Sequence, residues 1–333
     1  MELNKIFTSH LVFAAKKPIR IYGTGKGSAR IKFASFEKTV ISDDESWSVE
    51  FEPMEYGGPY NLEVDFVDGK VILEDIYVGE VFLFAGQSNM QFKMKESSTP
   101  PDEYRSNRKL RLFSTDRIEK TDKFTSDDGW VVCDEKDVGE WSAIAYLASQ
   151  KFSVEKDIAV GVVVSYQGAS VIESWVPENT FEKYNINIPI EEKFIDHTHE
   201  QFGIWNGDGV LYNYSLSQLI PYALSAVVWY QGESDSSVAE GEVYCEELCA
   251  LIDTWRSDFR DDSLLFIVVQ LANTYHKMTE GWKLVQKAQE DVVNKRPFVK
   301  MVASADVCET NNIHPPTKDK LANRIADILN KEL

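Results

Sequence analysis

The sequence has few cysteines and no long apolar segment. Its four cysteines, Cys133, Cys245, Cys249 and Cys308, are few for 333 residues, which is not typical of a small disulfide-stabilised secreted fold. The only apolar stretch in the first thirty residues is residues 11–15, too short for a secretory signal or a membrane-spanning helix. We therefore predict a cytoplasmic protein with free thiols and no membrane partner.

Basic residues are also scarce. Lysine and arginine together number 35, against 54 aspartates and glutamates, which gives a formal net charge of −19. Such a surplus of negative charge repels the phosphate groups of nucleic acids and of anionic membranes, so nucleic acid is not an expected partner. The glycine-rich stretch GTGKGSAR at residues 23–30 is not followed by a helical pattern, and we expect a hairpin turn there rather than a phosphate-binding loop.

Two patterns of apolar residues divide the chain. Residues 18 to about 78 contain short alternating segments between glycine, proline and acidic turns, a pattern typical of antiparallel β structure. From residue 79 onward, continuous apolar runs alternate with helical spacing, as in a parallel sheet covered by helices. We predict an α/β protein with a small N-terminal β-sandwich domain, residues 1–78, and an open, doubly wound parallel sheet in residues 79–333.

Candidate site residues follow the apolar runs, because doubly wound sheets bind ligands beyond the carboxyl ends of their strands. Four such ends supply a serine, a glycine, amides, carboxylates and a histidine: Ser88, Gly168, Gln231, Glu233, Asp306, Asn311, Asn312 and His314. A serine becomes a nucleophile when a histidine takes its proton and N–H donors stabilise the oxyanion. Of the five histidines, His314 alone lies on a predicted strand-end loop, so we pair it with Ser88.

Other interpretations of single motifs stay open. Ser88 also fits a helix N-cap, and Met90 stands where the GxSxG motif of α/β hydrolases has glycine. His197 and His199 lie beside Asp196 and Glu200 in an acidic loop, but their spacing is not that of a known closed metal site. Cys245 and Cys249 share a helix face without further ligands at zinc-site spacing, so we assign them to core packing. We predict no metal and no cofactor.

Four blocks of the sequence resemble the conserved blocks of a known family. They are GQSNM (residues 86–90), QGASVIESW (167–175), VVWYQGESD (227–235) and NNIHPPTKDKLANRIA (311–326). In order and spacing they are similar to the SGNH hydrolases, in particular to the sialate O-acetylesterases and related carbohydrate acetylesterases, over nearly the whole chain. The resemblance implies a flavodoxin-like sheet, with Ser88 as nucleophile and His314 as general base. It also implies an oxyanion hole formed by the backbone N–H groups of Ser88 and Gly168 and the side-chain amide of Gln231.

One residue departs from the family pattern. Many SGNH hydrolases have an aspartate three residues before the histidine, where this sequence has Asn311. An asparagine can position an imidazole but cannot offset its positive charge. Two arrangements are therefore open: a dyad with a backbone carbonyl near Asn312 accepting the Nδ1 proton, which we favour, or a triad completed by Asp306 or Glu233.

The resemblance implies a serine esterase that removes O-acetyl groups from carbohydrates through an acetyl-enzyme. The similarity of the sequence blocks to sialate O-acetylesterases favours a sialate substrate. The acidic composition, without a basic cluster at the strand ends, favours neutral xylan or mannan oligosaccharides. A non-catalytic carbohydrate-binding relative is an alternative from another class, and a lipase is less favoured because no apolar lid segment is found. Candidate aromatic platforms for a sugar ring are Trp175, Trp205, Tyr212, Trp229 and Tyr275.

Overall fold

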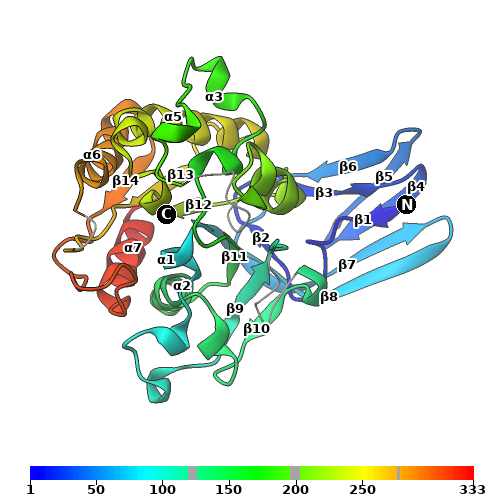
Figure 1. Ribbon diagram of the computed structural model, residues 1–333. Coiled ribbons are helices and arrows are strands. Elements are labelled where there is room, and N and C mark those ends of the chain that lie inside the picture. Colours follow the sequence, from blue (N-terminus) through cyan, green and yellow to red (C-terminus); the bar gives the residue numbers. More distant parts are fainter. Residues whose placement is uncertain (119–125, 196–202, 276–277) are drawn as a thin grey trace.

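The computed structural model describes residues 1–118, 126–195, 203–275 and 278–333. Figure 1 shows an N-terminal β region beside a larger sheet that has helices on both faces. The fold is a mixed α/β fold with a large mixed sheet, which confirms the predicted α/β class. Over the described ranges, no helix combines the length and the apolarity needed to cross a membrane.

The N-terminal β region consists of strands β1 to β7 and the first half of β8. Strand β3 pairs antiparallel with β1 and β6, and β4 pairs antiparallel with β5 and β7, which confirms the antiparallel structure expected here. The glycine-rich stretch at residues 23–30 comprises the end of β3, a bend at residues 25–26 and the start of β4. The expected hairpin is wrong, because β3 and β4 pair with different partners. The strands are β1 (Glu2–Leu3), β2 (Val12–Ala14), β3 (Ile19–Thr24), β4 (Gly27–Phe33), β5 (Phe36–Ser42), β6 (Ser46–Phe51) and β7 (Gly57–Phe66).

Strand β8 (Gly69–Gly86) belongs to both parts of the molecule. Its first half pairs antiparallel with β7, residues 77–79 pair with β2, and its second half pairs in parallel with β11 and β12. Buried and exposed side chains are mixed up to Tyr77, whereas every residue from Val78 onward is buried. The change in burial falls between Tyr77 and Val78, and the strand itself continues without a break across this point.

The central sheet has the strand order β10-β9-β11-β8-β12-β13-β14. All neighbours are parallel except β10, which is antiparallel to β9 at one edge. Every residue of β11, β12 and β13 is buried, as expected for parallel strands covered on both faces. The strands are β9 (Asn107–Ser114), β10 (Val131–Cys133), β11 (Val160–Tyr166), β12 (Ala226–Tyr230), β13 (Leu265–Val269) and β14 (Val299–Val302).

Two helix pairs cover this sheet. Helix α2 packs on α7, and α5 packs on α6; Figure 1 shows the first pair below the sheet and the second above it. Three of these helices begin at a hydroxyl that accepts a backbone N–H bond, at Ser142, Ser237 and Thr279. The helices are α1 (Ser88–Gln91), α2 (Ala143–Lys156), α3 (Thr180–Lys183), α5 (Val238–Phe259), α6 (Glu280–Lys295) and α7 (Asp319–Glu332).

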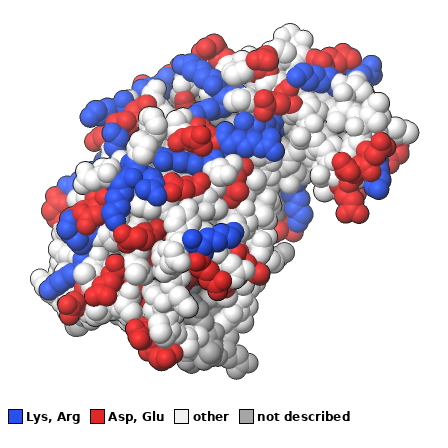
Figure 2. All heavy atoms as spheres, turned by 90° about the horizontal axis from the view of Figure 1, so that it is seen from above, with Lys and Arg blue, Asp and Glu red and all other residues white. Residues whose placement is uncertain are grey.

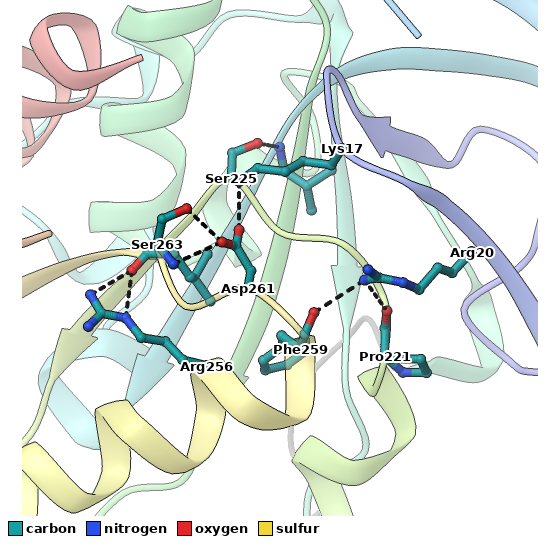
Figure 3. Close-up of polar contacts among 10 residues, drawn as sticks. Lys17, Arg20, Pro221, Ser225, Arg256, Phe259, Asp261 and Ser263 are labelled. Atoms are coloured by element: carbon teal, nitrogen blue, oxygen red, sulfur yellow. Dashed lines mark hydrogen bonds and ion pairs between the residues drawn. The ribbon is translucent and has the colours of Figure 1, made fainter. Parts of the chain in front are cut away.

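A polar junction joins the N-terminal β region to the end of helix α5 (Figure 3). Arg20 of β3 donates from Nη1 to the carbonyl oxygen of Phe259 at 3.2 Å, and from Nε to Glu50 at 2.9 Å. Lys17 bonds Asp261, just beyond the helix, at 2.6 Å. Cations at the C-terminal end of a helix are favourable, because the last carbonyl groups carry partial negative charge. We call these contacts of Lys17 and Arg20 the junction.

Candidate active site

Ser88 and His314 meet at the carboxyl end of the central strands. Ser88 is the first residue of α1, directly after β8, and His314 lies on the loop between β14 and α7. Nε2 of His314 lies 2.8 Å from Oγ of Ser88, a hydrogen-bond distance that permits proton transfer between the two groups. The fold thus brings together a hydroxyl and an imidazole that are 226 positions apart in the chain.

The turn that presents Ser88 requires glycine at position 86. Gly86 has a φ of +139°, and a Cβ built on it would lie 2.1 Å from the carbonyl oxygen of Tyr230 in the neighbouring strand β12. The next amide, of Gln87, donates to that same oxygen at 3.0 Å. The chain can therefore leave β8 sharply and start α1 with Ser88 at the sheet edge.

A cavity of about 610 Å³ lies over the Ser88 and His314 pair. Much of its described lining is apolar, and Glu233 is the one carboxylate among the described residues that line it. No lysine or arginine is found among those described lining residues. They are Gln87, Ser88, Gly168, Ala169, Phe194, Ile195, Glu233, Ser234, Ile313 and His314.

Gly168, after strand β11, lies in contact with helix α1, which begins at Ser88. A Cβ built on Gly168 would lie 3.8 Å from the Cβ of Ser88. Its backbone N–H donates to Oε1 of Gln91 at 3.1 Å, and that oxygen also accepts from Arg117 at 3.2 Å. Gln91, three residues after Ser88, thus holds the Gly168 loop against α1.

Gln231 is buried and its side-chain amide is fully engaged. Nε2 donates to the carbonyl oxygen of Ser170 at 2.8 Å and to the carboxylate of Asp235, while Oε1 accepts from the hydroxyl of Tyr244 at 2.7 Å. Gln231 is not among the described residues that line the cavity. In this conformation, both amide hydrogens tie loops together.

The residues considered for orienting His314 lie in three different environments. Both carboxylate oxygens of Asp306 bond Arg324, at 2.7 and 2.6 Å, and these bonds lower the pKa of Asp306 to about 2. Asn311 and Asn312 are both exposed, and the side chain of Asn312 accepts from the backbone N–H of His314 at 2.9 Å. Within the described part of the chain, Nδ1 of His314 has no hydrogen-bond partner.

A buried polar cluster beside Ser88 was not predicted from the sequence. Nδ2 of Asn89 donates to Oε1 of Glu233 at 2.7 Å and to the carbonyl oxygen of Ile313 at 2.9 Å. Oδ1 of Asn89 accepts from Nζ of Lys318 at 2.7 Å. Asn89 and Lys318 were not predicted, although both belong to the sequence blocks that resemble the family. Asn89 is next to Ser88 and Lys318 is four residues after His314, and this proximity in the sequence could have identified them. We call Asn89, Glu233 and Lys318 the Asn89 cluster.

Burial shifts the pKa values of the titratable groups around Ser88. It raises the pKa of Glu233 to about 7 and lowers that of Lys318 to about 8, because a buried charge loses its hydration. The pKa of His314 is lowered from its ordinary value, first by burial and then by the positive charge of Lys318. A low pKa keeps the imidazole neutral near pH 7, which is the form that accepts a proton.

The structure also shows the environments of the candidate aromatic platforms and of the cysteines. Trp175 and Trp229 are fully buried and pack edge to face at 5.9 Å, so their prediction as sugar platforms is wrong. Trp205 is also buried, Tyr212 is half-buried, and Tyr275 is 77% exposed. All four cysteines are free.

The acidic loop with the two histidines was the other candidate for a metal site. Its four residues, Asp196, His197, His199 and Glu200, lie outside the described residues. Among the residues that are described, no cluster of three or more His, Cys, Asp or Glu side chains is arranged to hold a metal ion.

The chain is similar to known esterases. It is 24% identical to the sialate O-acetylesterase of Homo sapiens over 349 residues, covering 91% of this chain and 65% of that protein. It is also 24% identical to that of Pongo abelii, over 86% of this chain and 60% of that protein. The chain therefore spans about 60 to 65% of the length of these relatives.

One solved structure has the same fold over almost the entire chain. It is a carbohydrate acetylesterase from Xanthomonas citri, with a TM-score of 0.84 at 24% identity, covering 98% of this chain and 73% of that one. Residues 78–331 match the family described as "Carbohydrate esterase, sialic acid-specific acetylesterase". The match takes in both Ser88 and His314, and the chain belongs to this family of carbohydrate esterases.

Proposed function

We propose that this protein is a serine esterase that removes O-acetyl groups from carbohydrates, with Ser88 as nucleophile and His314 as general base. The observation that carries the proposal is the 2.8 Å contact between Nε2 of His314 and Oγ of Ser88, which lies at a cavity of about 610 Å³. Membership of a carbohydrate esterase family supports the choice of substrate class.

The reaction follows from this geometry in two halves. His314 takes the proton of Ser88 as Oγ attacks the carbonyl carbon of the acetyl ester, and then gives the proton to the departing sugar oxygen. This half forms an acetyl-enzyme. In the second half, His314 activates a water molecule in the same way, and acetate leaves with restoration of the Ser88 hydroxyl.

The oxyanion donors in this proposal are the backbone N–H groups of Ser88 and Gly168 and the amide of Gln231. Donors of this kind each stabilise the transition state by about 3 kcal/mol. The N–H of Gly168 is bonded to Gln91, and the amide of Gln231 is bonded to Ser170 and Asp235. Gly168 and Gln231 must therefore exchange partners or share a hydrogen when the oxyanion forms, whereas Ser88 lies directly at the reacting atom.

The catalytic group is a dyad in this proposal. Asp306 uses both carboxylate oxygens on Arg324, and Glu233 accepts from Asn89. His314 therefore acts without a carboxylate on Nδ1. The lowered pKa of His314 supports the dyad, because it holds the imidazole in the neutral form that a general base requires.

A neutral acetylated oligosaccharide, such as a xylan or mannan fragment, is a second candidate substrate beside an acetylated sialic acid. The described residues that line the cavity offer one carboxylate, Glu233, and no lysine or arginine. A sialic acid carries a carboxylate of its own, which is repelled there unless a cation compensates it.

We also assign the finer features of the fold. The strands β11-β8-β12-β13-β14 follow the order 2-1-3-4-5 when they are numbered along the chain, which supports a flavodoxin-like, doubly wound core. The two groups of antiparallel strands in the N-terminal β region contact each other through aromatic rings, for example Trp47 and Phe66 at 6.0 Å. These contacts support a β-sandwich over residues 1–78, followed by a catalytic domain over residues 79–333.

The test is turnover of 4-nitrophenyl acetate together with labelling by a serine-directed fluorophosphonate. We expect wild-type protein to be labelled and active, and Ser88→Ala to be neither. Acetate release from acetylated xylan, mannan and sialic acid then identifies the sugar. Absence of labelling in folded wild-type protein that still binds sugar would replace the esterase with a carbohydrate-binding protein.

A further inference from the structure

Lys318 is a buried cation beside the candidate nucleophile. Its side chain has no exposed surface, and Nζ lies 4.7 Å from the ring centre of Phe92 and 5.8 Å from that of Tyr230. Removing an ammonium group from water is unfavourable by several kcal/mol unless hydrogen bonds or opposite charges compensate it. Among the described residues, its Nζ donates a hydrogen bond to Oδ1 of Asn89 at 2.7 Å. A lysine held at this energetic cost needs an explanation beyond packing.

The chemistry of its neighbours fixes the orientation of the Asn89 amide. An ammonium group only donates and a carbonyl oxygen only accepts, so Oδ1 must face Lys318 and Nδ2 must face the carbonyl of Ile313. The other Nδ2 hydrogen then points to Oε1 of Glu233. The amide thus stands between a cation and a carboxylate, and all its hydrogen-bonding groups are used.

The same amide connects the two ends of the catalytic pair. Asn89 follows Ser88 in α1, and Ile313 precedes His314 in the loop before α7. From the buried ammonium, the Asn89 amide and the Ile313 carbonyl, we propose that Lys318 is a positioning residue. It holds Asn89 in place, so that the imidazole loop is fixed against Ser88, and its charge keeps His314 neutral. This inference rests on the proposed roles of Ser88 and His314.

The groups that face the two titrating side chains come from several elements. His314 is affected by burial and by Lys318, which lower its pKa, and by Glu96 of the short helical turn Met94–Glu96, which raises it. Lys318 is faced by Cys308, Glu233 and Glu309, each of which favours its charged form against the effect of burial. Removing the charge of Lys318 therefore raises the pKa of His314.

The experiment compares wild type with Lys318→Met, Lys318→Arg and the matched control Lys320→Met, an exposed lysine on α7. Two readouts are measured from pH 4.5 to 9: the kinetic constants kcat and kcat/KM for 4-nitrophenyl acetate, and the ¹⁵N chemical shifts of the His314 imidazole, assigned with His314→Gln. For Lys318→Met we expect about a tenfold loss of kcat, the size of a lost hydrogen bond to a charged group. We also expect both midpoints to move to higher pH. Lys318→Arg should keep the wild-type midpoints, and Lys320→Met should match wild type in every value.

A folded Lys318→Met protein whose two midpoints coincide with those of wild type would overturn the proposal and leave Lys318 as a packing residue. If Lys318→Met does not fold, Asn89→Ala tests the same connection, with an expected loss of kcat of about tenfold at little-changed KM; an unchanged kcat would refute it. If wild type itself shows no ester hydrolysis, the esterase proposal fails, and the ¹⁵N midpoint of His314 still decides the effect of Lys318.

Discussion

The junction and the Asn89 cluster both contain buried cations, but the two cations differ in kind. At the junction, Arg20 bonds the carbonyl oxygen of Phe259 and the carboxylate of Glu50, and a guanidinium stays charged at every physiological pH. At the sheet edge, the cation is Lys318, whose pKa burial lowers to about 8. The buried cation of Arg20 is thus a guanidinium, whereas the buried cation beside the candidate nucleophile is a lysine whose lowered pKa allows it to lose its proton.

The largest expected effect is on activity alone and leaves the stability provided by the junction unchanged. Ser88→Ala removes the proposed nucleophile and should lower kcat for 4-nitrophenyl acetate by about a thousandfold or more. The free energy of unfolding, measured with urea, should change little, because the junction is untouched. A residual activity within tenfold of wild type would mean that another group attacks the ester.

The next effect should appear at the junction alone. Arg20→Met leaves the carbonyl oxygens of Phe259 and Pro221 without their donor, and we expect the free energy of unfolding to fall by about 1 to 3 kcal/mol. The midpoint of the kcat/KM profile against pH should stay where it is. The matched control is Arg30→Met, an exposed arginine of β4 paired with Asp65, which we expect to leave stability unchanged. A shifted pH midpoint in Arg20→Met would contradict the expectation that the junction and the Ser88 site act independently.

A smaller effect concerns pH in the unmodified protein. His314 must be neutral to accept a proton, and its pKa lies below the ordinary value of about 6.5 because of burial and Lys318. The kcat/KM for 4-nitrophenyl acetate should therefore rise with pH through a midpoint below 6.5 and be level at neutral pH. A midpoint above 7 would show that a carboxylate stabilises the protonated imidazole.

The smallest effect tests the dyad. Asp306→Asn breaks an exposed ion pair with Arg324, and we expect kcat to stay within about threefold of wild type, since surface pairs contribute little. Asn311→Ala should behave in the same way, whereas His314→Ala should lose activity. Loss of activity in Asp306→Asn to the level of His314→Ala would make Asp306 the third member of a triad.

The positions of Ser88, Gly168 and His314 could be predicted because they depend on the backbone. A residue that directly follows a buried parallel strand lies at the carboxyl edge of the sheet, whatever its side chain does. This rule and the strand order account for the contact of Gly168 with α1. His314 lies further along the loop after β14, which ends at Val302, so its contact with Ser88 also depended on pairing a serine with a histidine.

Side-chain networks could not be predicted in the same way. Gln231 follows a strand just as Ser88 does, yet its amide is used by Ser170 and Asp235. The partners of Asn89 come from residues 233, 313 and 318, and apolar spacing carries no information about such contacts. Burial of Trp175 and Trp229 likewise depends on how α5 covers the sheet, which periodicity alone does not fix.

Strand β8 has a mechanical consequence for the molecule. Along its 18 residues it is hydrogen-bonded in turn to β7, β2, β11 and β12, so no free linker separates the N-terminal β region from the turn that carries Ser88. Pulling on the N-terminal β region would load the strand that leads into the turn carrying Ser88. Such a continuous strand transmits force and resists bending. Unfolding of the N-terminal β region would therefore also disturb the position of Ser88.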